Sequence, residues 1–192
     1  MENEYTYLKL GPEHNYGQCI ISDNYKLIYI LIPKNASSTM RTYIKNKLNG
    51  YEFNYFHCNE EQKKYYTFCI IRNIQDRFYS AINTILIRNK NDISNMNNNT
   101  IHHFVDNMID EHLVRQVEFI KNIRIDYYLN FDYLHNLIQK INSRNKNINE
   151  KTIINIDINT LQNVYKTDQE IYNNIIILDE NKYGEFTQKL FF

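Results

Sequence analysis

One buried strand followed by a polar turn and a helix constrains this chain more than any other feature. Residues 27–32, LIYILI, form an unbroken run of strand-forming apolar residues, typical of a parallel strand covered on both faces. Pro33 ends the run, and residues 34–39, KNASST, are small or polar. The next apolar residues repeat at the spacing of one helix face: Met40, Tyr43, Ile44 and Leu48. We therefore expect a strand, a tight turn and a helix within residues 27–48.

A turn of this kind is a common way to bind phosphate. Backbone N–H groups and the positive end of the helix dipole converge on the turn, and Lys34 adds a full charge. The GxxxxGK[ST] sequence of ATP- and GTP-binding loops is not present, because the turn has no glycine and Lys34 does not directly precede a hydroxyl residue. Ser and Thr before a helix are also ordinary caps. The buried strand and the lysine at its end favour the phosphate site.

Residues 33–39, PKNASST, resemble the 5′-phosphosulfate loop of sulfotransferases. These enzymes use 3′-phosphoadenosine-5′-phosphosulfate (PAPS), and the likeness is greatest to the carbohydrate-modifying, Golgi-type branch. The resemblance implies that the loop binds the 5′-phosphosulfate through Lys34, Asn35, Ala36, Ser37, Ser38 and Thr39.

A second stretch resembles the element that holds the 3′-phosphate of PAPS in the same family. It is RNIQDRFYS, residues 72–80, directly after the apolar run Tyr66–Ile71. The family places an Arg at the strand end and a Ser eight positions later, and Arg72 and Ser80 stand at this interval. Arg offers forked donors to phosphate, and Ser offers a short hydroxyl bond. The sequence departs from the family at positions 73–74, where Asn-Ile replaces the frequent Asp-Pro.

Sulfuryl transfer needs a cation beside the leaving phosphate and a base for the acceptor proton. The place of Lys34 in the loop predicts that Lys34 is this cation. The family presents a His or Glu between the two phosphate elements, and His57 is the only histidine in that interval, so we predict His57 as the base. An unperturbed imidazole has a pKa of about 6.5, which suits a base at neutral pH. Glu60 and Glu61 are alternatives.

The prediction of His57 as the base includes an expectation about the place of its strand in the sheet. Residues 51–58 alternate enough to form a second strand, and we expect this strand to lie beside residues 27–32, so that His57 faces the loop. A partly buried or surface histidine without a role is the plain alternative. His112 and Arg115 are further candidates for contact with the acceptor.

Apolar strands that alternate with amphipathic helices predict an α/β fold. We expect a P-loop-like, three-layer α/β/α arrangement with a central, mainly parallel sheet. The length of 192 residues predicts a single sulfotransferase-like domain over residues 1–192. Within it we expect a PAPS-binding core at 27–90 and a helical acceptor or capping part at 101–192. In that second part we expect a strand at Tyr127–Asn130 and a helix over Leu161–Tyr172.

Charge and composition limit the ligands. The net charge is +0, yet residues 34–90 hold ten basic and four acidic residues, which favours a polyanionic ligand. The three cysteines and the histidines lack metal-ligand spacing, so we expect no metal.

No apolar run approaches the roughly 20 residues of a membrane span, and no signal-peptide pattern is seen, so we expect no transmembrane segment and a cytoplasmic location. We expect no nucleic-acid partner.

The leading hypothesis is a sulfotransferase that moves a sulfuryl group from PAPS to a hydroxyl of a carbohydrate or glycan acceptor. The alternative is a non-catalytic module that binds a nucleotide or polyanion on a degenerate sulfotransferase scaffold. A small-molecule kinase is disfavoured because the glycine loop is missing. Acceptor specificity is expected in loops such as the Asn-rich residues 89–100.

Overall fold

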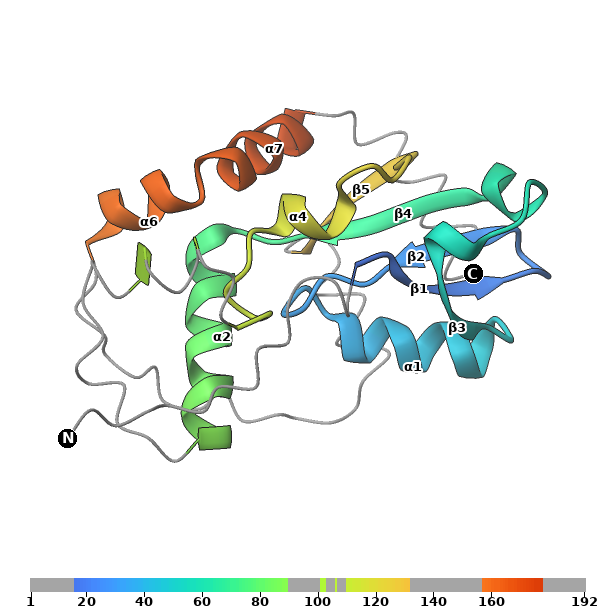
Figure 1. Ribbon diagram of the computed structural model, residues 1–192, viewed down its shortest axis with the longest axis horizontal. Coiled ribbons are helices and arrows are strands. Elements are labelled where there is room, and N and C mark those ends of the chain that lie inside the picture. The colour runs from blue at the N-terminus through green and yellow to red at the C-terminus, as the bar shows by residue number, and fades with distance from the viewer. Residues whose placement is uncertain (1–15, 90–100, 103–105, 107–109, 132–156, 178–192) are drawn as a thin grey trace.

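The computed structural model describes residues 16–89, 101–102, 106, 110–131 and 157–177 (Figure 1). Residues 90–100, most of the Asn-rich loop, lie outside the described residues. The described residues form a mixed α/β fold with one five-stranded sheet. The strands are β1 (Gln18–Ser22), β2 (Leu27–Ile30), β3 (Tyr51–Asn54), β4 (Tyr66–Ile71) and β5 (Tyr127–Asn130). The helices are α1 (Ser37–Lys47), α2 (Ile74–Asn89), α4 (Gln116–Ile120), α6 (Ile158–Val164) and α7 (Lys166–Ile177).

The sheet is parallel on one side and antiparallel on the other. Its strand order is β3-β1-β2-β4-β5, and β4 pairs in parallel with both β2 and β5. β1 pairs antiparallel with both β2 and β3. The expected parallel arrangement therefore holds for β2, β4 and β5, whereas β1 and β3 extend the sheet as an antiparallel edge.

One expectation about the sheet is wrong. The strand formed by residues 51–54 does not lie beside β2, because β1 pairs with both and separates them. The strand also ends at Asn54, and Tyr55–His57 form a turn of 3-10 helix, η2. A hairpin formed by the residues before β2 takes the place next to β2, since β1 and β2 are joined by the short turn at residues 23–26.

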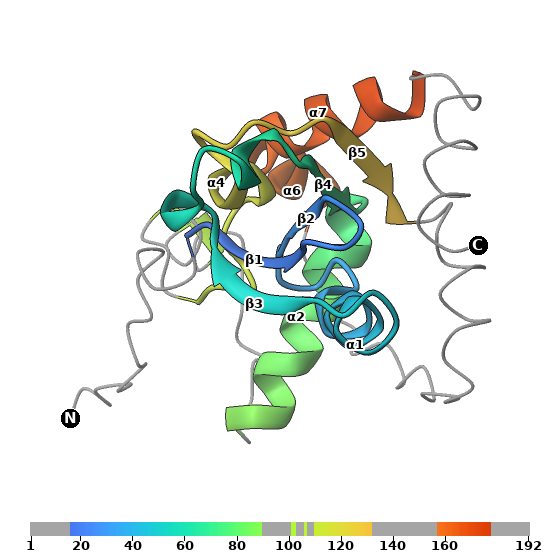
Figure 2. The ribbon, with the colours of Figure 1, turned by 90° about the vertical axis from the view of Figure 1, so that its right-hand side faces the viewer.

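Helices pack on both faces of the sheet, as Figure 2 shows with α1 on one side and α7 on the other. Alternate residues of β2 face opposite clusters, as the period of a strand requires. Tyr29 packs with Met40 and Ile44 of α1, whereas Ile28 and Ile30 pack with residues of α4 and α7. This double coverage explains why β2 reads as a continuous apolar run.

The helix α2 begins directly after β4 and runs away from the sheet (Figure 1). Its apolar face packs with α6 and with Leu113 in a third cluster. β2 and β4 are parallel, so the turn after β2 and the first residues after β4 lie at the same edge of the sheet. None of the described helices is long and apolar enough to span a bilayer.

Candidate functional site

The turn between β2 and α1 has an unusual backbone. Lys34 (φ 70°) and Ala36 (φ 59°) both take positive φ, a region that residues other than glycine enter only uncommonly. Asn35 between them is fully buried. Ala36 is the N-cap of α1, and its methyl group cannot accept a hydrogen bond from the first N–H groups of the helix. The start of α1 is thus built without the side-chain cap that Ser or Thr would supply, which suits an external anion.

A buried amide pair fixes this turn to the end of β4. Asn35 Nδ2 donates to the carbonyl of Ile70 (2.6 Å) and to Gln116 Oε1 (2.5 Å). Gln116 also makes two hydrogen bonds with the backbone of Arg72: its Oε1 accepts from the N–H (3.0 Å), and its Nε2 donates to the carbonyl (2.9 Å). The side-chain NH₂ of Asn35, a residue predicted to contact the cofactor, is therefore engaged inside the protein.

Two arginines bind the carbonyl groups of the turn. Arg72 Nη1 donates to the carbonyl of Lys34 (3.0 Å), and its guanidinium lies 4.3 Å from the ring centroid of Phe131. Arg77 Nε donates to the carbonyl of Pro33 (3.1 Å). Because both carbonyls bond toward the protein, their orientation is set by β4 and α2.

Arg77 is a residue that the sequence analysis missed. Its side chain is 1% exposed, and its Nη2 has no partner among the described residues. Burial lowers the pKa of Arg77, an effect that nearby Tyr165 and Asp168 oppose. The available signal was its position: Arg77 falls on the same helical face as Ile74, Phe78 and Ala81, where an apolar residue is expected.

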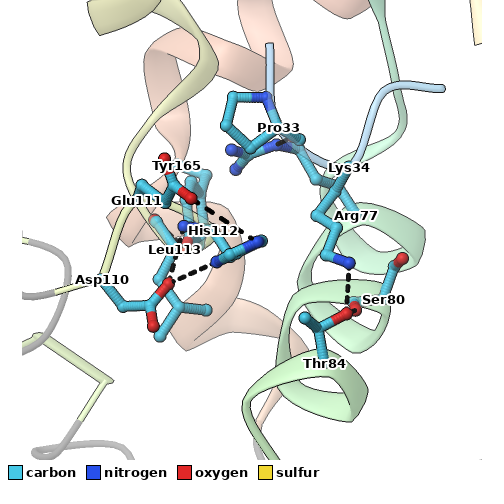
Figure 3. Close-up of polar contacts among 10 residues, drawn as sticks. All are labelled: Pro33, Lys34, Arg77, Ser80, Thr84, Asp110, Glu111, His112, Leu113 and Tyr165. Carbon is cyan, nitrogen blue, oxygen red and sulfur yellow. Dashed lines mark hydrogen bonds and ion pairs between the residues drawn. The ribbon is translucent and has the colours of Figure 1, made fainter. Parts of the chain in front are cut away.

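The predicted cation and the predicted 3′-phosphate ligand meet on α2. Lys34 Nζ donates to Thr84 Oγ1, and Thr84 donates in turn to the carbonyl of Ser80 (3.1 Å). Figure 3 shows the Lys34 side chain beside the helix that carries Ser80 and Thr84. Ser80 and Thr84 are one turn apart and lie on one side of α2. Lys34, Arg72 and Ser80, each partly exposed, are thus gathered at one end of the sheet. Thr84 was not predicted.

The remaining predicted loop residues lie in the first turn of α1. Ser37 and Thr39 are partly exposed, and Ser38 is exposed. They are helical residues and not N-caps, since the cap is Ala36.

His57 lies at the same edge of the sheet but farther away. Asn54, the last residue of β3, pairs with Gln18, whose carbonyl accepts from the N–H of Leu31. β3 and β2 are therefore two strand spacings apart, roughly 10 Å. His57 is exposed and makes no side-chain hydrogen bond with the described residues.

The alternative bases Glu60 and Glu61 are exposed surface residues. Glu60 pairs with Lys63 (2.9 Å), and Glu61 pairs with Lys64 (3.2 Å). The hydrogen bond from Lys63 lowers the pKa of Glu60. Neither carboxylate contacts Lys34 within the described part of the chain.

A second histidine stands in a more enclosed setting. His112 is 6% exposed, and Asp110 Oδ1 lies 2.8 Å from its Nδ1 and also accepts from its backbone N–H (2.8 Å). Its Nε2 is 3.9 Å from Glu111 Oε1. In Figure 3 the imidazole points from the 110–113 segment toward the side occupied by Lys34 and Thr84.

The segment that carries His112 is anchored by the C-terminal helices. Tyr165 Oη donates to the carbonyl of Leu113 (2.6 Å), and Arg115 Nε donates to the carbonyl of Val164 (2.7 Å). Asp168 on α7 accepts from the N–H groups of Gln116 (2.7 Å) and Val117 (3.0 Å). Burial raises the pKa of Asp168, and Arg77 and these N–H groups counteract the rise.

Among the described residues, no group of three or more His, Cys, Asp or Glu side chains is arranged to hold a metal ion. Comparison with known proteins adds no assignment: no family model, curated protein or solved structure matches this chain.

Proposed function

We propose that this chain is a sulfotransferase that transfers a sulfuryl group from PAPS to a hydroxyl of a carbohydrate or glycan acceptor. The proposed fold is a P-loop-like, three-layer α/β/α domain. One observation carries the proposal: two segments that resemble PAPS-binding elements are joined by direct hydrogen bonds. The Asn35–Gln116–Arg72 contacts and the bond from Arg72 to the Lys34 carbonyl hold them at one edge of the sheet.

The residues at this edge fit a ligand with two separate phosphate groups. The turn and the first turn of α1 offer backbone N–H groups, the hydroxyls of Ser37, Ser38 and Thr39, and the Lys34 ammonium to the 5′-phosphosulfate. Arg72 and Ser80 would hold the 3′-phosphate, through a guanidinium and a hydroxyl. PAPS, when bound, supplies the activated sulfuryl group. The described residues do not form a metal-binding group, and the proposal uses none.

Lys34 has the chemistry to stabilise the transition state. The leaving 5′-phosphate gains negative charge as the sulfuryl group departs, so a positive charge beside it lowers the barrier. Lys34 Nζ donates to Thr84 Oγ1 in the structure. The lysine stem has several rotatable bonds, so we propose that Lys34 leaves Thr84 and turns to the phosphate when the donor binds.

The first test concerns donor binding. PAPS and its desulfated product, 3′-phosphoadenosine-5′-phosphate (PAP), should raise the melting temperature by mass action, and ATP with magnesium should do so weakly. Arg72→Ala should weaken PAP binding by about 1.5–3 kcal/mol, the range for a hydrogen bond to a charged group. Arg124→Ala is the matched control, because Arg124 is a half-exposed arginine paired with Asp126.

Calorimetric titration with PAP, followed by PAPS turnover on a panel of desulfated glycosaminoglycans and neutral glycans, checks this expectation. Equal stabilisation by ATP and PAP, unaffected by Arg72→Ala, would exclude the proposed donor. Tight PAP binding without transfer of sulfate to any acceptor would instead favour the non-catalytic alternative.

A further inference from the structure

The structure assigns the acceptor-activating base to His112, oriented by Asp110, in place of His57. This inference rests on the proposed function, because a general base is needed only if the chain transfers a sulfuryl group. Three observations carry it: the hydrogen bond that orients the ring, the fixed position of the 110–116 segment, and the direction in which the ring points.

The contact with Asp110 defines which nitrogen can act as the base. A carboxylate at 2.8 Å from Nδ1 favours the tautomer with its proton on Nδ1, because a carboxylate only accepts hydrogen bonds. The lone pair then resides on Nε2, the nitrogen on the far side of the ring from Asp110, where the Glu111 carboxylate at 3.9 Å is beyond hydrogen-bond distance. Asp110 also accepts from the His112 N–H, so its carboxylate is held in place by two bonds from one residue. Asp110 is a positioning residue in this arrangement.

The position of the 110–116 segment is fixed relative to the phosphate-binding turn. Gln116 bonds directly to Asn35 in the turn and to Arg72 at the end of β4. Leu113 packs with Ile74, Phe78 and Ala81 of α2, the helix that carries Ser80 and Thr84. His112 directly precedes Leu113, so both anchors limit its distance from the turn.

The direction of the ring brings Nε2 to the correct side. Figure 3 shows the imidazole pointing away from Asp110 and toward Lys34 and Thr84. The sulfuryl group of a donor bound at the turn would lie on that side, next to Lys34. His57 lacks each of these features: it is exposed, has no orienting carboxylate within the described part of the chain, and follows a strand separated from β2 by β1.

The proposed step is a direct displacement. His112 Nε2 takes the proton of the acceptor hydroxyl as the acceptor oxygen bonds to sulfur. The bond between sulfur and the bridging oxygen of the 5′-phosphate breaks, and its electron pair stays on the phosphate oxygen beside Lys34. The products are the sulfate ester, PAP and an imidazolium, which returns its proton to solvent.

Two substitutions of His112 test the assignment. His112→Asn retains a side-chain N–H near the position of Nδ1 for Asp110 but has no counterpart of Nε2, and His112→Ala removes the whole ring. Both should lower kcat by about 10²–10⁴-fold, the usual contribution of a general base. The Kd for PAP should change by less than about threefold, because the base touches the acceptor. Added imidazole should restore part of the activity of His112→Ala. His57→Ala, made in parallel, should retain kcat.

The pH profile and the tautomer give further readouts. The acidic limb of the wild-type kcat profile should be absent from both His112 variants. Within the described part of the chain, Asp110 and Glu111 contact the ring, and Figure 3 draws Lys34, Arg77 and Tyr165 as the other charged or titratable groups on this side of the molecule. NMR of ¹⁵N-labelled histidine should show the His112 proton on Nδ1 at neutral pH. Asp110→Asn should shift the proton to Nε2 and lower kcat without altering the Kd for PAP.

The possible results separate the two proposals. Loss of activity in His57→Ala with retention in His112→Asn would overturn the assignment and leave the sulfotransferase proposal intact. An NMR spectrum that shows the His112 proton on Nε2 in the wild-type protein would also overturn the assignment, and this measurement needs no acceptor substrate. A wild-type protein that does not bind PAP would remove both proposals together.

Discussion

Lys34 has two roles that depend on different atoms of the same residue. Its carbonyl is bound by Arg72, which fixes the backbone of the turn, whereas its ammonium donates to the hydroxyl of Thr84. A lysine held by a neutral hydroxyl loses little when it transfers to a phosphate, because the new contact is between opposite charges. The backbone of Lys34 is thus fixed by Arg72, while its ammonium is held by a neutral hydroxyl and is proposed to turn to the donor phosphate.

Lys34→Ala should therefore affect turnover more than donor binding. The expected loss in kcat is about 10²–10³-fold, comparable to removal of one donor from an oxyanion site. Steady-state kinetics with PAPS as the varied substrate measures this effect. Lys45→Ala is a suitable control, because Lys45 is a half-exposed lysine of α1 paired with Glu52. If only the Michaelis constant for PAPS rises, Lys34 binds the ground state and the proposed role is wrong.

The sequence predicted candidate ligand-binding residues of the site, and it missed residues that hold the turn in place in the structure. Lys34, Arg72 and Ser80 stand in motifs with a defined spacing, so they were found without a structure. Gln116 and Arg77 act from 81 and 44 residues away in the chain, through bonds to Asn35 and to the Pro33 carbonyl. No local pattern encodes such a contact. The base was predicted at His57 from the family's placement of a His or Glu between the two phosphate elements and from the expectation that β3 neighbours β2. The intervening β1 removes the second reason.

At the scale of elements, the turn between β2 and α1 takes its shape from backbone conformations that its residues do not favour. Side chains other than glycine are disfavoured at positive φ by about 1–2 kcal/mol each. Lys34 and Ala36 both adopt it. The hydrogen bonds of Arg72, Arg77 and Gln116 with the turn and its neighbours offset this cost.

A substitution at Ala36 should reveal this strain. Ala36→Val should lower the free energy of unfolding by about 1–3 kcal/mol, because a β-branched residue is strongly disfavoured at positive φ. Ala36→Gly should change it by less than about 1 kcal/mol, since relief of strain and the entropy of glycine oppose each other. Urea unfolding measures both, with Thr42→Val on the exposed face of α1 as the control. A Val variant as stable as the Gly variant would show that position 36 is not strained.

The elements themselves were predicted well where periodicity is strong. The apolar runs at 27–32 and 66–71 became β2 and β4, and the apolar spacing after Ile74 became α2. The helix expected over residues 161–172 is two helices, α6 and α7, separated at Tyr165. Tyr165 directs its hydroxyl to the Leu113 carbonyl, a tertiary bond that the sequence pattern does not contain. The antiparallel edge of the sheet was also not evident, since pairing partners are not encoded in a single strand.

At the scale of the whole molecule, the core encloses ionisable groups in their neutral form. Burial raises the pKa of the thiols of Cys19 and Cys69, and that of the Tyr29 hydroxyl. The folded-state pKa of each thiol lies above the value of about 8.5 in an unfolded chain. Their contribution to stability is therefore complete below about pH 8.5 and is lost as the pH rises toward the folded pKa.

The free energy of unfolding should consequently fall by about 2–3 kcal/mol between pH 7.5 and pH 9.5. Each of the two thiols lowers it by about 1.4 kcal/mol per pH unit above the unfolded pKa of about 8.5, which covers about one pH unit of this range. Urea titrations at the two pH values measure the change. Cys69→Ala should reduce the difference by roughly half, and thiol reagents should react with Cys19 and Cys69 only on unfolding. A free energy of unfolding that is independent of pH in this range, with both thiols intact, would contradict the raised pKa values of Cys19 and Cys69.

The hydrogen bonds of Gln116 with Asn35 and Arg72 also have a consequence for the order in which the chain folds. They join segments 81 and 44 residues apart, and Asp168 secures them from a further 52 residues along the chain. Contacts between residues so distant in sequence are costly in chain entropy and form slowly. β2 and α1 can form early from local contacts, yet the turn between them is locked only once α7 has docked. A chain still emerging from the ribosome would therefore hold most of its sheet well before the turn between β2 and α1 is fixed.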